Sequence, residues 1–282
     1  WNEIQKNQNL LQSVQNILNK IIGAFSIVVL WEKSPNELVA FKDGPPLIVG
    51  LSKDKSNSEF FVVSDVQAAL VHTNRFVYLN DREVVHIKDH AVNYYNAQGE
   101  KLQKEVSILD WSTDRAEKMG FEHYMLKEIY EQPRSVANAM APFIDTDTQS
   151  VKLTNIGFEA ETVFKKIDRI IFVACGTSFY AAMIGKYLIE QICRVPVDTD
   201  VASEFRYRRP VIPKNTLVIS ISQSGETADT LAAVRLAKEQ GAELLSITNV
   251  AQSSIDREAN GHMYMNSGVE IGVASTKAFT ST

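Results

Sequence analysis

The sequence predicts an α/β domain in the second half of the chain, built on a doubly wound parallel sheet with helices on both faces. A mainly antiparallel unit precedes it. The chain has 282 residues, about twice the length of a typical single domain, so two compact units are expected. Short β-rich runs fill the first 110 positions, whereas apolar strands alternate with helices after position 157.

The first unit opens with one amphipathic helix and continues as short strands. Leucine, valine and isoleucine recur at helical spacing over residues 10–21, and Gly23 follows as a stop signal. Turn residues such as Ser34-Pro35-Asn36 and Asn96-Ala97-Gln98-Gly99 separate the β-rich runs that come next. These runs cover residues 24–31, 37–42, 46–50, 59–64, 75–79, 83–88 and 92–96. We therefore expect an antiparallel unit over residues 1–111.

The second unit follows a charged helical segment, residues 112–157, which we interpret as an interdomain linker. Strands are predicted at residues 169–174, 195–201, 216–220, 243–248 and 262–266, and helices at 178–192, 226–240 and 254–257. Apolar strands joined by helices are typical of a parallel sheet that is buried on both faces. Such sheets bind ligands at the carboxyl ends of their strands.

Composition excludes several classes of function. The net charge of −5, from 29 Lys and Arg against 34 Asp and Glu, gives no reason to expect a nucleic-acid partner. The two cysteines, Cys175 and Cys193, and the five histidines form no ligand cluster, so we expect no metal, no cofactor and no disulfide framework. No apolar run reaches the roughly 18 to 20 residues that span a bilayer. We expect a cytoplasmic protein without a membrane partner.

Polar sequence follows two strands of the predicted parallel sheet and leads into helices. The first stretch is Cys175-Gly176-Thr177-Ser178, and the second is Ser222-Gln223-Ser224-Gly225-Glu226-Thr227. A helix start offers free N–H donors and a partial positive charge, to which hydroxyl and amide side chains add further donors for a phosphate. Glycine permits close approach of the backbone. The alternative is that these Ser and Thr residues only cap helices.

The absence of two sequence motifs argues against two kinds of phosphate ligand. No GxxxxGKS or GxxxxGKT sequence for a nucleoside triphosphate and no GxGxxG sequence for a dinucleotide occurs, which favours a monophosphate. A third stretch, from Gly268 to Lys277, suits a loop that closes over a ligand, with Ser275 as a partner for a sugar hydroxyl. The pattern alone slightly favours a plainer interpretation, a strand-to-helix loop with Lys277 in solvent.

Four motifs in the second half resemble the first sugar isomerase (SIS) domain of the glucosamine-6-phosphate synthase family. They are ACGTS at 174–178, ASEFRYR at 202–208, SQSGETADTL at 222–231 and EIGVASTKAFT at 270–280. In the first half, GAFSIVVL, KDGPPLIVGL, FFVVSDVQA and HYMLKEIYEQP resemble the second half of that family's α+β class II glutaminase (Ntn-type) domain and its linker. The resemblance implies a glutaminase half over 1–111, a linker over 112–157 and a C-terminally truncated first SIS domain over 158–282.

The family uses ammonia from glutamine to convert fructose 6-phosphate to glucosamine 6-phosphate, so the resemblance implies these two substrates. It implies that the phosphate is held by Ser222, Gln223, Ser224 and Thr227, and that the sugar contacts Thr177, Ser178 and Ser275. Asp65 matches the acidic residue that receives the α-amino group of glutamine, and a carboxylate suits an ammonium. Cys175 matches a cysteine of the sugar site, where we expect it to be packed and inert.

The family's catalytic residues have no match in this sequence. The glutaminase nucleophile and the second SIS domain, which supplies the isomerase residues, are missing, so we expect an inactive internal fragment and assign no catalytic residue. The full-length enzyme is expected to be a homo-oligomer, a dimer. Two alternatives remain: a non-catalytic SIS sugar-phosphate sensor, although residues 1–110 show no helix-turn-helix or basic face, and a deglycase-type SIS enzyme, which would need no glutaminase half.

Overall fold

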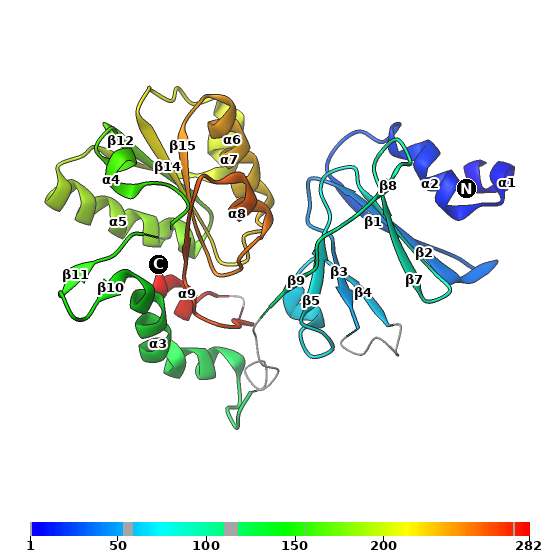
Figure 1. Ribbon diagram of the computed structural model, residues 1–282, viewed down its shortest axis with the longest axis horizontal. Helices are drawn as coiled ribbons and strands as arrows, with labels where there is room; N and C mark the ends of the chain where they lie inside the picture. The colour runs from blue at the N-terminus through cyan, green and yellow to red at the C-terminus, as the bar shows by residue number, and fades with distance from the viewer. Residues whose placement is uncertain (1, 53–58, 110–117, 155, 273) are drawn as a thin grey trace. The chain divides into compact units, whose positions relative to one another are not determined.

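The computed structural model describes residues 2–52, 59–109, 118–154, 156–272 and 274–282. Contacts divide the chain into two compact units, residues 1–113 and 114–282. The first contains two antiparallel sheets and the second contains one parallel sheet with helices on both faces (Figure 1). Each unit is described by itself below.

The first unit begins with α1 (Asn2–Asn7) and α2 (Leu10–Leu18). Its two sheets have the strand orders β1-β2-β6-β7-β8 and β4-β3-β5-β9, and their pairings are antiparallel. The bounds are β1 Phe25–Trp31, β2 Ser34–Asp43, β3 Ile48–Leu51, β4 Phe60–Val63, β5 Arg75–Tyr78, β6 Val84–Lys88, β7 Ala91–Tyr95, β8 Lys101–Leu102 and β9 Ser107–Ile108. The seven predicted strands are confirmed. The two-residue strands β8 and β9 are too short to give a periodic signal.

Alternation of side chains along β2 explains how the first sheet is buried on both faces. Val39 and Phe41 pack with the apolar side of α2, which includes Leu18. Ala40, between them in sequence, points to the opposite face and packs with Val49 of the second sheet. Successive strand residues point to opposite faces, so one strand supplies both cores.

The hairpin between β1 and β2 corrects one predicted turn. Trp31 pairs with Ser34 across a two-residue turn, so the predicted separator Ser34-Pro35-Asn36 is wrong and these residues begin β2. The pairing register shifts between Leu30 and Trp31. This irregularity accommodates Pro35, which has no N–H to donate to a regular ladder.

The second unit is a doubly wound α/β layer, as predicted. Its five parallel strands have the order β13-β12-β14-β15-β16. They are β12 Arg169–Ala174, β13 Val197–Val201, β14 Thr216–Ser222, β15 Glu243–Thr248 and β16 Gly261–Tyr264. One face packs against α5 (Thr177–Cys193) and α9 (Lys277–Ser281), and the other against α6 (Ala202–Arg208), α7 (Ala228–Glu239) and α8 (Ser254–Glu258). Small, aliphatic and aromatic residues from these helices, such as Ala182, Phe205 and Val234, fill the space against the sheet.

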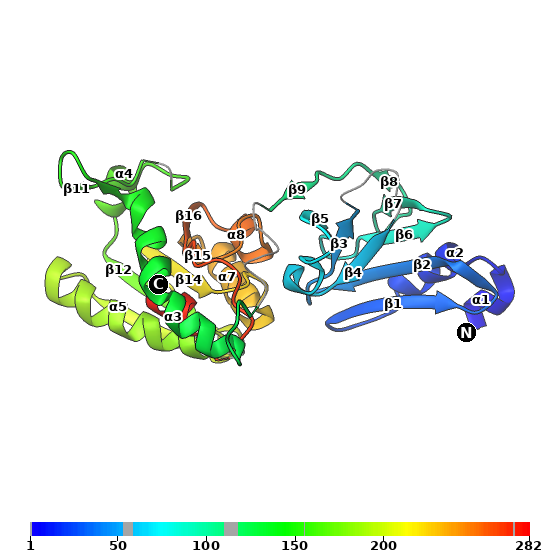
Figure 2. The same cartoon turned by 90° about the horizontal axis from the view of Figure 1, so that it is seen from below.

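Residues 112–157, the predicted linker, contain regular structure that packs on the α/β unit. They include α3 (Tyr124–Met140), the 3-10 helix η3 (Ala141–Phe143) and the hairpin of β10 (Ile144–Asp145) and β11 (Ser150–Val151); a short helix, α4 (Ala160–Phe164), follows. Figure 2 shows α3 beside α9, with which it makes extensive contact. The described part of this segment therefore belongs structurally to the second unit.

Helix α3 continues through Pro133, which lies inside it. A proline cannot donate a backbone N–H to the carbonyl four residues earlier, in this case that of Ile129. The side-chain amide Nε2 of Gln132 donates to that carbonyl at 3.0 Å. A neighbouring side chain thus supplies a hydrogen bond at the position that proline leaves open.

Candidate functional site

The strand order of the second unit creates one position where a ligand can enter between loops. The chain runs from β12 to β13 on one side of the sheet, and then places β14 on the other side of β12. In open α/β sheets of this order, ligands bind at such a switch point, beyond the carboxyl ends of the two strands. The stretches Cys175–Ser178 and Ser222–Thr227 lie at the ends of these two strands.

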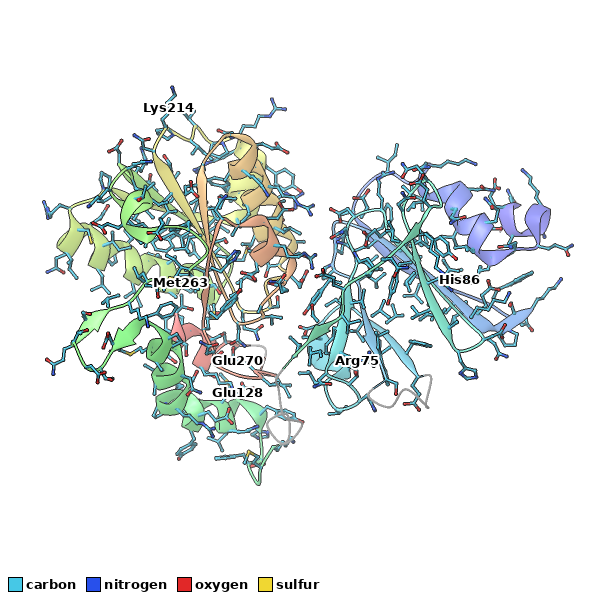
Figure 3. The ribbon with its side chains drawn as sticks, in the orientation of Figure 1. Arg75, His86, Glu128, Lys214, Met263 and Glu270 are labelled. Carbon is cyan, nitrogen blue, oxygen red and sulfur yellow. The ribbon has the colours of Figure 1, made fainter. Side chains whose placement is uncertain are left out.

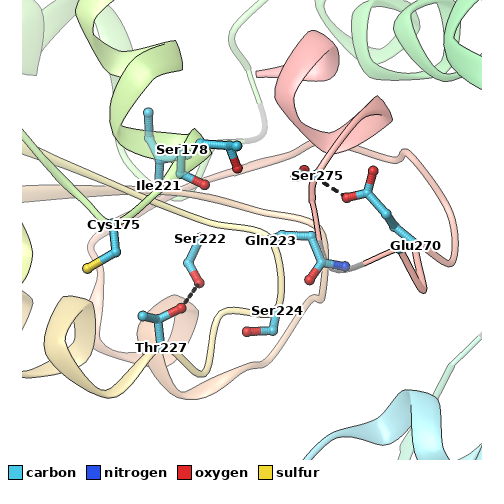
Figure 4. A pocket seen from close by; sticks show the side chains of 11 residues that line it. Cys175, Ser178, Ile221, Ser222, Gln223, Ser224, Thr227, Glu270 and Ser275 are labelled. Atoms are coloured by element: carbon cyan, nitrogen blue, oxygen red, sulfur yellow. Dashed lines mark hydrogen bonds between the residues drawn. The ribbon is translucent and has the colours of Figure 1, made fainter. Parts of the chain in front are cut away.

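A pocket of about 170 Å³ lies at this switch point (Figure 4). The structure brings together in it all seven residues that were predicted to hold the sugar phosphate. The lining consists of Cys175, Thr177, Ser178, Ile221, Ser222, Gln223, Ser224, Thr227, Glu270, Gly272 and Ser275. Three segments far apart in sequence therefore converge on one cavity.

The loop after β14 makes hydrogen bonds within itself and to the start of α8. The Ser222 hydroxyl accepts from the Gly225 backbone N–H at 3.0 Å and lies 3.0 Å from the Thr227 hydroxyl. Behind the loop, the Gly225 carbonyl accepts from Ile255 N at 2.9 Å, and the Glu226 carboxylate accepts from Ser254 N at 2.8 Å. The start of α8 thus supports the loop from the side opposite the pocket.

The hydroxyl of Thr227 does not cap the helix that follows it. Thr227 is the N-cap residue of α7, yet its side chain makes no capping hydrogen bond and interacts instead with Ser222. In addition, the Gln223 side-chain nitrogen Nε2 is buried and has no hydrogen-bond partner within the described part of the chain. A buried amide donor without a partner is costly, so a ligand acceptor at this position would satisfy it.

The loop after β12 contributes the start of a long helix. Thr177 and Ser178 are the first two residues of α5, after Gly176, which has a φ of 59°. Cys175 is half-buried and packs against the core, and its sulfur accepts a weak hydrogen bond from Thr230 Oγ1 at 3.9 Å. The packing of Cys175 agrees with the prediction, although its thiol also lines the pocket.

The third segment is organised by Glu270, which sequence reasoning did not single out. Glu270 is 5% exposed, and its carboxylate accepts from the Ser275 hydroxyl at 2.8 Å. It also accepts from Thr276 and Lys277 backbone N–H groups at 2.8 and 2.9 Å. A glutamate seven positions before the first residue of a helix follows no standard capping pattern, so the sequence carried no local signal for this role.

The side chain of Lys277 is buried, whereas the interpretation from sequence placed it in solvent. It is 3% exposed, and its Nζ lies 2.6 Å from Glu131 Oε2 on α3. The prediction of a solvated lysine is therefore wrong. Its partner stands 146 positions earlier, and a contact of that range leaves no trace in the local sequence.

The pocket offers an anion no basic side chain within the described part of the chain. None of the described lining residues is Lys or Arg, and the single acidic one, Glu270, is surrounded by donors from the start of α9. Hydroxyl groups, a side-chain amide and the positive ends of α5 and α7 remain as sources of attraction. This donor set suits a phosphate group.

Asp65 belongs to the first unit, whereas the other predicted site residues belong to the second. It is half-buried between β4 and the 3-10 helix η1 (Val66–Ala69), and its carbonyl accepts from Ala68 N at 3.2 Å. Across the ranges that the structure describes, no group of three His, Cys, Asp or Glu residues could hold a metal ion. No helix in those ranges has the length and apolar character needed to cross a bilayer.

The second unit matches a known domain family, and the chain as a whole is similar to known proteins. The SIS domain model matches residues 163–282. Glutamine–fructose-6-phosphate aminotransferase (isomerizing) of Clostridium acetobutylicum is 46% identical over 273 residues, which are 97% of this chain and 44% of the relative. The protein of the same name from Aquifex aeolicus is 42% identical over 97% of this chain and 44% of its own length.

A solved structure supports the same assignment for the second unit. The C-terminal domain of glucosamine-fructose-6-phosphate aminotransferase from Francisella tularensis matches 58% of this chain and 45% of its own, with a TM-score of 0.55 and 46% identity. The chain thus spans less than half the length of the curated relatives described above. Residues 163–282 are an SIS domain, and the chain as a whole is a relative of the glutamine–fructose-6-phosphate aminotransferases.

Proposed function

We propose that this chain is part of an enzyme that converts fructose 6-phosphate and glutamine to glucosamine 6-phosphate and glutamate. In this proposal the pocket of the second unit binds the sugar phosphate, and the first unit contributes to glutamine binding. Sequence identity of 42% to 46% to aminotransferases of that name, over nearly the whole chain, supports it. The proposed location is the cytoplasm, and the proposed assembly is a homodimer.

The proposed domain assignment follows the resemblance of the two halves. Residues 1–111 would be the second half of a class II glutamine amidotransferase (Ntn-type) domain, and 158–282 the first SIS domain, with 112–157 between them. The two antiparallel sheets of the first unit fit an α+β domain half. The similarity to the aminotransferases covers this unit as well, which neither a sugar-phosphate sensor nor a deglycase would require.

The observation that carries the sugar-phosphate proposal is the convergence of neutral donors at the switch point. Ser222, Gln223, Ser224 and Thr227 would hold the phosphate, and Thr177, Ser178 and Ser275 would contact the sugar. The buried Gln223 Nε2 without a partner is a donor that awaits an acceptor. A dianion satisfies several such donors at once.

We expect the chain to bind fructose 6-phosphate at least about tenfold more tightly than fructose, because only the former can accept from the Ser222–Thr227 donors. Isothermal titration of the chain with fructose 6-phosphate, fructose and inorganic phosphate measures this. Inorganic phosphate should compete with the sugar phosphate. Equal affinity for the two sugars would contradict the assignment of a phosphate site.

Asp65 gives a second test, on the glutamine side. Asp65→Asn should raise the KM for glutamine by about tenfold, because an amide keeps the shape but loses the charge that attracts an ammonium. The measurement is steady-state glutaminase activity in a protein of the relatives' full length. Asp89→Asn, the same change at an exposed residue of the same unit, is the control. Equal effects of the two changes would argue against a role for Asp65 in glutamine recognition.

A further inference from the structure

Helix α3 reaches the sugar-phosphate pocket through one buried carboxylate. Glu128 is 2% exposed. Its Oε1 accepts from the backbone N–H of Ile271 at 2.6 Å and of Gly272 at 3.0 Å, and its Oε2 lies 3.2 Å from Gly272 N. Since Gly272 lines the pocket, this helix contacts the backbone of the lining directly.

A second carboxylate holds the other end of the same lining segment. Glu270 accepts from the Ser275 hydroxyl and from the backbone N–H groups of Thr276 and Lys277. Figure 3 shows Glu128 and Glu270 at the same edge of the α/β unit. Glu128 therefore fixes the position of Gly272, while Glu270 fixes that of Ser275.

The helix that carries Glu128 is itself anchored to the body of the unit. Glu131 forms an ion pair with Lys277 at 2.6 Å, and the Ser135 hydroxyl lies 2.7 Å from that of Ser281. The fit at Gly272 is tight, because a Cβ there would lie 2.5 Å from Glu128 Oε2. The carboxylate cannot move far from the lining while α3 and α9 stay in contact.

We infer that Glu128, which lies outside the matched SIS domain of residues 163–282, is a positioning residue for the sugar side of the pocket. This inference rests on the proposed sugar-phosphate function. A single carboxylate oxygen that accepts from two successive N–H groups sets the direction of the backbone there, and its removal takes this acceptor away from two partly buried donors. The predicted linker is in this respect a component of the site.

The position of Glu128 implies that its loss affects binding of the sugar part of the ligand and binding of the phosphate part differently. It contacts the segment that carries Gly272 and Ser275, whereas the predicted phosphate residues Ser222–Thr227 are held by α8. Loss of Glu128 should therefore weaken binding of the sugar and leave binding of phosphate alone nearly unchanged. A merely destabilising change would weaken both.

The first test requires no ligand. Glu128→Ala in the full 282-residue chain should speed hydrogen exchange of the Ile271 and Gly272 amides by about tenfold or more, while amides of α7 keep their protection. Glu122→Ala, the same change at a carboxylate whose side chain is 83% exposed, is the matched control and should alter neither set. Unchanged exchange at both Ile271 and Gly272 would overturn the inference.

The second test measures ligand binding in the same proteins. Glu128→Ala should lower the affinity for fructose 6-phosphate by about tenfold and change that for inorganic phosphate by less than about twofold. Equal losses for both ligands would show general destabilisation and refute the positioning role. If the unaltered chain binds neither ligand, the proposed function fails, whereas the exchange experiment still decides whether Glu128 positions the segment.

A milder variant covers the case in which Glu128→Ala does not fold. Glu128→Gln keeps an oxygen that can accept from Ile271 and Gly272 but places an amide NH₂ where Oε2 lies, 3.2 Å from Gly272 N. Exchange should then rise at Gly272 more than at Ile271, and the affinity for fructose 6-phosphate should fall less than in Glu128→Ala. The same exchange rates in Glu128→Gln as in the unaltered chain would contradict the inference.

Discussion

Joint replacement of Ser222 and Thr227 by alanine is expected to lower the affinity for fructose 6-phosphate by about a hundredfold or more. Each hydroxyl would donate to or orient donors toward a charged oxygen, and the loss of one such bond costs about 1.5 to 3 kcal/mol. No lysine or arginine lines the described pocket and could compensate. The measurement is isothermal titration of the variant and the unaltered chain with fructose 6-phosphate and with fructose.

Ser220→Ala is the matched control for this experiment. Ser220 stands two residues before Ser222 on β14 and is 2% exposed, and its hydroxyl makes a long contact, 3.5 Å, to the Leu245 carbonyl. It does not line the pocket, so its replacement should leave both sugar affinities unchanged. If the double variant lost affinity for both sugars equally, or for neither, the two hydroxyls would serve the fold of the loop and not the phosphate.

The parallel sheet and the convergence of its polar loops could be predicted from sequence because both arise from local signals. After Arg169, the strand that ends at Ala174 is continuously apolar, which is typical of burial on both faces. The carboxyl ends of neighbouring parallel strands meet at one edge, so Ser178 and Ser222 had to lie near each other once β12 and β14 were adjacent. The loop pattern offered Ser275 as a sugar-hydroxyl partner but slightly favoured a plain loop there. The resemblance then favoured a place for Ser275 in the site, which the strand pattern alone did not require.

Contacts between segments far apart in the chain could not be predicted from such local signals. The partner of Glu128 stands 143 positions later in the chain, and a buried glutamate on a charged helix looks like any solvated one. Lys277 was misjudged for the same reason, since its burial depends on Glu131 of α3. Charged residues are rarely fully buried unless they are paired. A charged side chain is therefore expected in solvent until its partner is known.

Gly225→Ala is expected to destabilise the second unit by about 3 kcal/mol and to weaken binding of fructose 6-phosphate severely. Gly225 has a φ of +68°, and a Cβ there would lie 1.9 Å from the Ser253 hydroxyl and 2.5 Å from Ser253 Cβ. Left-handed backbone costs an L-residue about 1 to 2 kcal/mol, and overpacking adds about 1 to 3 kcal/mol. Ser253 is fully buried at the start of α8, so relief requires the loop itself to move.

Gly241→Ala separates the steric clash from the backbone strain. Gly241 also has a positive φ, +79°, but a Cβ there would have no atom within 4 Å. This control should cost only about 1 kcal/mol and leave the affinity for fructose 6-phosphate unchanged. Urea unfolding followed by the helical circular dichroism signal, together with titration of the sugar phosphate, measures both effects.

Addition of Ser253→Gly to Gly225→Ala should restore part of the stability, because it removes both clashing atoms. Equal losses at Gly225 and Gly241, with no recovery in the double variant, would show that contact with Ser253 does not determine the shape of the phosphate loop.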